Sequence, residues 1–179
     1  MTIRSYKNKT PVIGDKTYID DSAIVIGGVT IGNDVSIWPL TVIRSDVNSI
    51  CIGNKTNIQD GSVLHVTHDG PYDYNHGGYA LNIGNNITVG HNVILHGCTI
   101  GDNCLIGMGS TIMDGVVIKP NTIIGAGSLV SPSKQLDEGC LYVGRPVKKV
   151  RKLNNDEIES IQYSANHYVE LKNTYLEEL

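Results

Sequence analysis

The chain has no phenylalanine and one tryptophan among its 179 residues, so aliphatic side chains must fill its core. It also lacks a basic surplus: 14 lysines and arginines stand against 18 acidic residues, which excludes the charge pattern of a nucleic-acid-binding face. No apolar run approaches the roughly 20 residues that cross a bilayer, and the N-terminus has no signal-peptide pattern. These absences favour a cytoplasmic protein that binds neither nucleic acid nor membranes.

Closely spaced cysteine pairs are absent as well. The four cysteines, Cys51, Cys98, Cys104 and Cys140, contain no CxxC motif. In a reducing compartment such residues stay as thiols, and cysteine is among the most frequently buried residue types. We therefore expect four free cysteines that behave as small apolar residues.

What the chain does have is an aliphatic residue at nearly every sixth position. The series is interrupted by three extra residues near Val47 to Cys51 and by a long insertion after Leu64, and one step, from Leu95 to Ile100, is a residue short. The positions are Ile13, Ile19, Val25, Ile31, Ile37, Ile43, Ile52, Ile58, Leu64, Ile83, Val89, Leu95, Ile100, Ile106, Ile112, Ile118, Ile124 and Val130. Neither a helical nor an alternating period explains this pattern, whereas a short strand followed by a sharp corner does.

Three such sides close a triangular coil, and stacked coils form a parallel β-helix. Eighteen sides predict about six coils, and a spacing of about 4.8 Å gives a prism about 29 Å tall. We expect one domain over residues 1–179, with the β-helix at 11–135. The insertion at 66–82, rich in Gly, Pro, Asn and Asp, is predicted to protrude from a corner as a loop.

A helix is predicted over residues 154–178. Asn154 can cap its first turn, and Glu157 stands at the position that completes a capping box. At 1.5 Å per residue the helix would be about 34 Å long, enough to run alongside the prism. Its apolar stripe consists of Ile158, Ile161, Ala165 and Tyr168.

The repeat also places three histidines relative to one another. His65 and His96 each follow the aliphatic residue of sides that lie one coil apart, so they should stack about 4.8 Å apart above Arg44. His91 belongs to a different column, above Asp60. A zinc–nitrogen bond is only about 2.0–2.1 Å long, so His91 would have to reach the ion of a neighbouring subunit. The pattern predicts a metal site of three imidazoles with an open position, split across an interface.

Four segments resemble the gamma-class carbonic anhydrases: V-I-R-S-D at 42–46, N-I-Q-D-G-S-V-L-H at 57–65, V-G-H-N-V-I-L-H-G-C at 89–98 and I-G-M-G-S at 106–110. The resemblance implies a left-handed parallel β-helix with a C-terminal α-helix packed alongside, assembled as a homotrimer. It implies zinc or iron held between subunits by His65, His91 and His96. The implied reaction is the reversible hydration of carbon dioxide to bicarbonate by metal-bound hydroxide.

The same resemblance assigns roles around the metal. Arg44 and Asp46 match an intersubunit salt bridge. Asn57, Gln59 and Asp60 match polar residues beside the ligands, with Gln59 placed to orient the metal-bound solvent. Each of these roles is implied by the family pattern rather than by the spacing of the residues.

The chain departs from the family pattern at the proton-transfer step. Acidic residues of the best-studied members are replaced here by Val47 and His68. His68 is a candidate proton relay, since imidazole exchanges protons near neutral pH, or an idle loop residue. Tyr163 and Asn166 resemble polar residues that the family brings to the active-site pocket from the helix, or they are a solvated helix face. The chain resembles the short-loop branch, in which activity is often weak.

Two other functions remain open. The fold also serves hexapeptide acyltransferases that use coenzyme A or acyl carrier protein, and a repeat alone does not separate the two chemistries. The protein could also be a non-catalytic metal-binding assembly protein. If a metal is bound, three imidazoles suit zinc, iron or cobalt.

Overall fold

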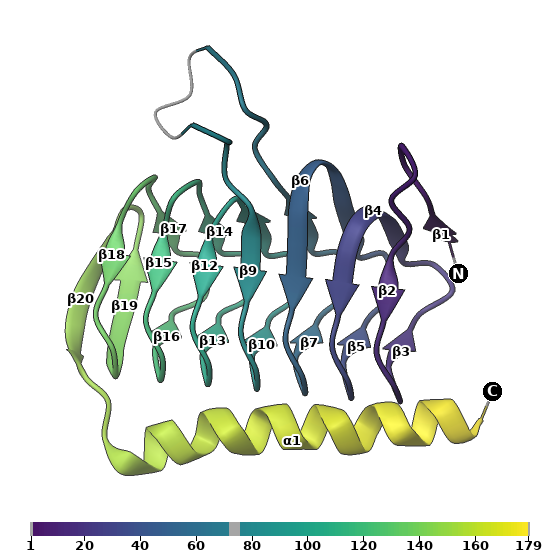
Figure 1. Ribbon diagram of the computed structural model, residues 1–179. Helices are drawn as coiled ribbons and strands as arrows, with labels where there is room; N and C mark the ends of the chain where they lie inside the picture. The colour runs from purple at the N-terminus through teal and green to yellow at the C-terminus, as the bar shows by residue number, and fades with distance from the viewer. Residues whose placement is uncertain (1, 72–75, 179) are drawn as a thin grey trace.

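The protein, described here from a computed structural model covering residues 2–71 and 76–178, is a prism of short strands with one helix along its side (Figure 1). The helix α1 spans Asn155–Glu177. The strands are β1 (Thr2–Arg4), β2 (Val12–Ile13), β3 (Tyr18–Ile19), β4 (Ile24–Ile31), β5 (Ser36–Ile37), β6 (Val42–Ile52), β7 (Asn57–Ile58), β8 (Val63–His65), β9 (Leu81–Ile83), β10 (Thr88–Val89), β11 (Ile94–His96), β12 (Thr99–Ile100), β13 (Leu105–Ile106), β14 (Thr111–Ile112), β15 (Val117–Ile118), β16 (Ile123–Ile124), β17 (Leu129–Val130), β18 (Gln135–Leu136), β19 (Cys140–Gly144) and β20 (Val147–Lys152).

The strands stack in parallel, as the hexad predicts. The longest strand, β6, pairs with β8 near its start and with β9 near its end, so it turns a corner and joins two faces of the prism in one sheet. That sheet runs β17-β14-β11-β8-β6-β9-β12-β15-β18, with β4, β1 and β2 attached. The third face is the sheet β20-β19-β16-β13-β10-β7-β5-β3. The predicted parallel β-helix with a C-terminal helix is therefore confirmed.

The predicted number of six coils is too low. Within the described residues, the third face alone holds seven parallel strands, from β3 to β19, and β20 adds an antiparallel edge. The repeat does not end at Val130, because Leu136 and Tyr142 continue the six-residue spacing and are buried. Leu136 is an aliphatic residue of the same series, whereas Tyr142 places an aromatic ring at the inward position of β19.

The interior of the prism is aliphatic, as the lack of phenylalanine requires. The hexad residues are buried except Ile13 and Ile19, which lie in the first coil and are partly covered. Three of the four free cysteines are buried in this core. The expectation of burial is wrong for Cys51, which is exposed because it alternates outward between the buried Ile50 and Ile52 of β6.

A column of amide side chains joins successive coils at one corner. The backbone N–H of Asn33 donates to Asn54 Oδ1, that of Asn54 to Asn85 Oδ1, and that of Asn85 to Asp102 Oδ1, at 2.7–2.8 Å. The N–H of Asp15 donates to Asn33 in the same way. This Asn/Asp ladder satisfies corner N–H groups that lie outside the strand pairing.

Asn54→Ala is expected to destabilise the fold by about 1 kcal/mol, because it removes the acceptor for Asn33 and the donor to Asn85 in one change. Urea unfolding at a fixed protein concentration measures the loss. Asn166→Ala, on the exposed face of α1, is the control and should not destabilise. Equal midpoints for wild type and Asn54→Ala would mean that water replaces the ladder at no cost.

Four aromatic residues meet where α1 packs on the third face of the prism. Trp38 lies between Tyr18, Tyr168 and Tyr175, with ring centroids 5.1–5.8 Å from it. The Trp38 indole N–H donates to Ser36 Oγ at 3.0 Å, so its polar atom is satisfied at this interface. The single tryptophan thus attaches the helix to the outside of the prism rather than filling its core.

Both ends of α1 are fixed by polar contacts. At the start, Asn154 and Glu157 form the predicted capping box. Near the end, the fully buried Lys172 makes an ion pair with Asp34 at 3.1 Å, tying the helix to an early coil. Ile161 and Ala165 of the predicted stripe are fully buried between these points. Within the described ranges, no helix combines the length and apolar character that crossing a membrane requires.

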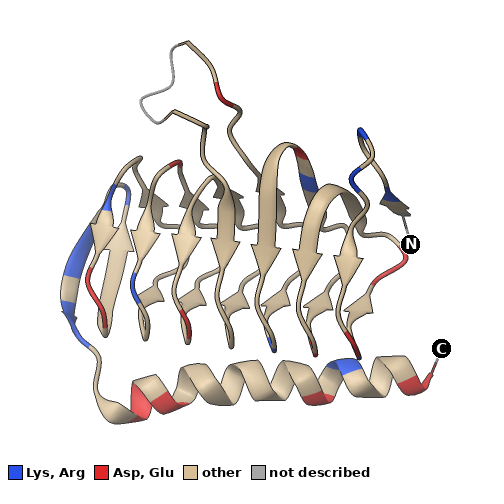
Figure 2. Ribbon diagram, viewed as in Figure 1, with Lys and Arg blue, Asp and Glu red and all other residues tan. Residues whose placement is uncertain are grey.

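Two features interrupt the regular prism. The segment between β8 and β9 protrudes from a corner, and its base is closed by mutual backbone hydrogen bonds between Thr67 and Tyr79. At the C-terminal end of the prism, β20 pairs antiparallel with β19 and is rich in lysine and arginine, coloured blue in Figure 2. These are Lys148, Lys149, Arg151 and Lys152.

Candidate metal centre

Two of the predicted ligands face each other on adjacent strands. The parallel register of β8 and β11 pairs His65 directly with His96, as the hexad predicts. Their ring centroids are 5.1 Å apart, and His65 Nδ1 lies 3.0 Å from His96 Nε2. Two nitrogens on one tetrahedral zinc, each about 2.0–2.1 Å from it, would be about 3.4 Å apart. The two imidazoles are thus spaced nearly as a metal ion requires.

The outer nitrogen of each ring contacts a carboxylate. His65 Nε2 lies 3.1 Å from Asp46 Oδ1, and His96 Nδ1 lies 2.7 Å from Asp114 Oδ1. Asp46 also pairs with Arg44 of the same chain. A carboxylate behind the ring is the usual support of a metal-binding histidine, because it fixes the ring and increases its basicity.

These contacts set the charge on the pair. Burial lowers the pKa of His65, and the nearby Arg44 and His96 lower it further, although the bond to Asp46 opposes the shift. Burial alone would raise the pKa of Asp46, but hydrogen bonds from His65 and Arg44 outweigh it and hold that pKa below its ordinary value. At neutral pH His65 is therefore the neutral imidazole that a metal can bind, beside an ionised carboxylate.

His91 occupies a separate column. It follows β10 at the corner of the prism, and its Nδ1 lies 3.0 Å from Asp60 Oδ2. The side chains of His91 and Asp60 are 45% and 48% exposed, so this pair is open to a partner. Across residues 2–71 and 76–178 of one chain, no group of three or more His, Cys, Asp or Glu side chains is arranged to hold a metal. One chain thus presents two imidazoles on one column and a third elsewhere.

The predicted polar neighbours of the ligands form a buried chain of hydrogen bonds. Gln59 Nε2 donates to Asn57 Oδ1 at 3.1 Å, and Asn57 Nδ2 donates to Thr88 Oγ1 at 3.0 Å. Thr88 Oγ1 lies 3.1 Å from Ser164 Oγ of α1. Gln59 and Asn57 are only 6% and 1% exposed, so their orientation is fixed by these bonds. The helix therefore contributes to holding Gln59 in place.

The two remaining candidates lie on exposed surfaces of the chain. His68 is exposed in the protruding loop, and a methyl group added at Gly70 would come within 3.0 Å of its Nε2. Tyr163 is 73% exposed on α1, and its ring stacks with His167 at a centroid distance of 6.3 Å. Neither side chain is buried beside the imidazole pair in the single chain.

Four residues near the site were missed by the sequence analysis: Thr67, Thr88, Asp114 and Ser164. Extending the histidine column by one coil reaches Met113, and Asp114 is the next residue, so the column alone does not identify it. Thr67 lies at the base of the loop, where its hydroxyl donates to Asp114 Oδ1. Ser164 sits beside the apolar stripe of the helix, where sequence alone gives no sign of a polar contact.

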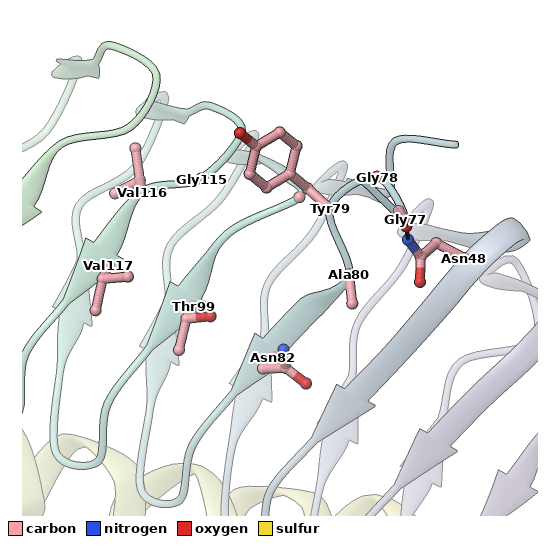
Figure 3. Close-up of a pocket in the computed structure, with 11 residues that line it drawn as sticks. Asn48, Gly77, Gly78, Tyr79, Ala80, Asn82, Thr99, Gly115, Val116 and Val117 are labelled. Carbon is pink, nitrogen blue, oxygen red and sulfur yellow. Dashed lines mark hydrogen bonds between the residues drawn. The ribbon is translucent and has the colours of Figure 1, made fainter. Parts of the chain in front are cut away.

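A pocket of about 390 Å³ lies on the face of the prism next to the one that carries His65 and His96 (Figure 3). Asn82 and Thr99 form its floor on β9 and β12, and the Tyr79 ring stands at its rim beside Gly115. Asn48 donates to the carbonyl of Gly77 and so holds the base of the loop at the other side. The pocket therefore lies between the base of the loop and the strands β9, β12 and β15.

Comparisons with known proteins agree with this architecture. The family model described as "Bacterial transferase hexapeptide (six repeats)" matches residues 10–45, 82–112 and 97–132. A hexapeptide transferase family protein from Anaplasma phagocytophilum has the same fold, with a TM-score of 0.87, 38% identity, and coverage of 97% of this chain and 98% of that one. The fold and the stacked repeats therefore define a hexapeptide-repeat β-helix protein.

Sequence relatives narrow the class further. Protein YrdA of Escherichia coli strain K12 is 54% identical over 98% of this chain and 95% of its own length. A carbonic anhydrase of Geobacillus kaustophilus is 44% identical, covering 94% and 87% of the two chains. With relatives named gamma carbonic anhydrase also among the matches, the chain belongs to the gamma carbonic anhydrase-like family.

Proposed function

We propose that the protein is a metal-dependent carbonic anhydrase that hydrates carbon dioxide reversibly at sites between the subunits of a homotrimer. The observation that carries the proposal is the imidazole pair, with His65 Nδ1 and His96 Nε2 3.0 Å apart and a carboxylate behind each ring. The names of the Geobacillus relative and of the gamma carbonic anhydrases support the same reaction.

The donor set fits a divalent metal but is incomplete within one chain. His65 and His96 would supply two nitrogens, and His91 of a neighbouring subunit would supply the third, leaving a position open. Zinc, iron or cobalt suits three imidazoles. Such an ion, when bound, would lower the pKa of a coordinated water to about 7 and so provide hydroxide near neutral pH.

The chain's own residues would orient the reactants and move the proton. Gln59, held by Asn57, would direct its side-chain carbonyl oxygen or its side-chain NH₂ group toward the solvent that attacks carbon dioxide. Asp60 would hold the His91 ring for the neighbouring site. His68, exposed on the loop, is the proposed proton relay, and Tyr163 would reach the site from α1 in the assembled trimer.

The trimer would also explain the apolar face between the two histidine columns. Val63 and Ile94 point outward from β8 and β11 and are 40% and 43% exposed, and Met108, one coil beyond His91 at the same corner, is 58% exposed. Neighbouring subunits would cover these side chains. The four free thiols fit a reducing compartment, so we place the protein in the cytoplasm.

Arg44→Ala is expected to weaken the trimer. The Arg44 side chain is 44% exposed beside Asp46, so it can pair across the interface as well as within its own chain. Sedimentation equilibrium over a dilution series should show smaller species at higher concentration than for wild type. Lys149→Ala, which breaks an exposed ion pair with Asp137 far from the site, is the matched control. An unchanged trimer in Arg44→Ala would remove Arg44 from the interface.

A test of the function uses one anaerobically purified sample. We expect about one metal ion per chain by elemental analysis, since a closed trimer has as many interfaces as chains. Stopped-flow hydration of carbon dioxide, with zinc and then iron, should exceed the buffer rate. Absence of metal would contradict the proposal and favour the acyltransferase alternative, since the Anaplasma relative is named a hexapeptide transferase family protein. Metal without any hydration rate would indicate an assembly protein.

A further inference from the structure

Asp114 reaches back one coil to contact a predicted metal ligand. It lies just after β14, and its Oδ1 is 2.7 Å from His96 Nδ1 and 2.8 Å from Thr67 Oγ1. The side chains of His96 and Asp114 are only 34% and 31% exposed. One carboxylate oxygen thus joins a strand residue of the β-helix to the first turn of the protruding loop.

The backbone is shaped to let this carboxylate approach. The step from Leu95 to Ile100 is a residue shorter than the other sides, and Gly97 turns the corner with φ +52°. A side chain at position 97 would overlap Asp114 Oδ1, and that φ disfavours any residue with a Cβ. Gly115 N donates to Gly97 O at 2.8 Å and fixes the two corners against each other. The shortened corner therefore leaves room for one carboxylate oxygen beside His96.

This contact decides which nitrogen of His96 is available to a metal. A carboxylate oxygen accepts a hydrogen bond from an imidazole N–H, so the 2.7 Å contact with Asp114 assigns the ring proton of His96 to Nδ1. His96 Nε2 then carries the lone pair, and it is the nitrogen that faces His65 Nδ1. Thr67 donates its hydroxyl hydrogen to the same Asp114 oxygen, which holds the carboxylate in line with the ring.

We propose that Asp114, oriented by Thr67, is the positioning residue that presents Nε2 of His96 to the metal. The inference rests on the proposed function for the identity of His96 as a ligand. Because Thr67 also pairs through its backbone with Tyr79 across the base of the loop, the loop is mechanically linked to the ligand. A loop next to the pocket would then influence metal affinity without contacting the metal.

The first measurement needs no metal. Nitrogen-15 NMR of the histidine rings in the metal-free protein, at mildly alkaline pH, should show His96 protonated at Nδ1 alone. In Asp114→Ala the ring should become a mixture of the two tautomers. Thr67→Val, which keeps the side-chain shape but removes the hydroxyl, should broaden the His96 ring signals or show a partial mixture of the two tautomers. Thr67→Ser, which keeps the hydroxyl, should give the wild-type spectrum. An unchanged Nδ1–H tautomer in Asp114→Ala would overturn the proposal.

The second measurement is zinc affinity by competition with a chelator. Asp114→Asn should weaken zinc binding about 10- to 100-fold, the usual cost of losing a carboxylate behind a histidine ligand. Thr67→Val should weaken it less, and Thr67→Ser should match wild type. Asp137→Asn, which changes an exposed carboxylate paired with Lys149, is the control and should bind as wild type does. Melting temperatures of the metal-free variants identify any loss of folding.

The outcomes separate the two proposals. Wild-type zinc binding that Asp114→Asn leaves unchanged would overturn the role of Asp114 and leave the proposed function standing. A wild-type protein that binds no zinc would overturn the proposed function. In that case the tautomer measurement still decides whether Asp114 fixes the ring.

Discussion

Mixing two metal-deficient variants, His65→Ala and His91→Ala, is expected to restore metal binding in their mixed trimers. Each variant alone keeps two of three imidazoles at every site and should bind metal poorly. In a mixed trimer, one interface places the intact His65 and His96 of one chain beside the intact His91 of the other. Since one of three interfaces has that order, metal should return to about one third of the wild-type content.

The pair His65→Ala and His96→Ala provides the matched control. Both residues lie in one column of one chain, paired directly across β8 and β11. No mixture of these variants can place an intact His65 and an intact His96 at the same site. Differentially tagged chains, purified over both tags and assayed for metal, distinguish the two pairs. Recovery in both pairs, or in neither, would show that the site is not divided between His91 and the stacked histidines.

Gln59→Ala is expected to keep its metal and lose most of its hydration activity. Gln59 makes its described bond to Asn57 rather than to an imidazole, so removing it leaves His65, His91 and His96 with their carboxylate partners. Loss of an orienting neighbour typically costs about 10- to 100-fold. The fall should appear in kcat/KM for carbon dioxide, while zinc affinity by chelator competition stays within about twofold of wild type.

Ser164→Ala tests whether the helix supports Gln59 through Thr88 and Asn57. Its activity should fall between wild type and Gln59→Ala, because the last bond of the chain is lost while Asn57 remains. Gln135→Ala, which removes an exposed glutamine from β18, is the control. Loss of metal in Gln59→Ala would mean that Gln59 supports a ligand instead of the solvent.

Much of the fold could be predicted because a single physical rule repeats along the chain. Each side of a coil needs one inward aliphatic residue, so spacing alone assigned the strands and paired His65 with His96. The rule failed where the inward residue was not aliphatic although the six-residue spacing continued. Tyr142 takes the inward place in β19, and an aliphatic pattern did not recognise it.

Other features depend on contacts between distant residues, which local patterns do not reveal. The Asn/Asp ladder follows the repeat, since Asn33, Asn54, Asn85 and Asp102 each stand two residues after an aliphatic position. Its bonds nevertheless join residues 17 to 31 apart. The contact between Asp114 and His96 likewise joins residues that are distant in the sequence. The link from Ser164 to Thr88 spans 76 residues and depends on how α1 lies on the prism.

The basic strand β20 has a consequence for how copies of the protein meet. A stack of parallel strands ends in unpaired backbone groups, which invite another chain to add its own strand. Here β20 turns back on β19, so the last parallel strand is paired within the molecule. The outer strand of this face then carries Lys148, Lys149, Arg151 and Lys152, of which Lys149 pairs with Asp137 and Arg151 with Glu157. Charged side chains on an edge strand disfavour its pairing with another chain. On this face the charged strand therefore disfavours pairing with the same edge of a second copy, whereas β17 and β18 end the other two faces.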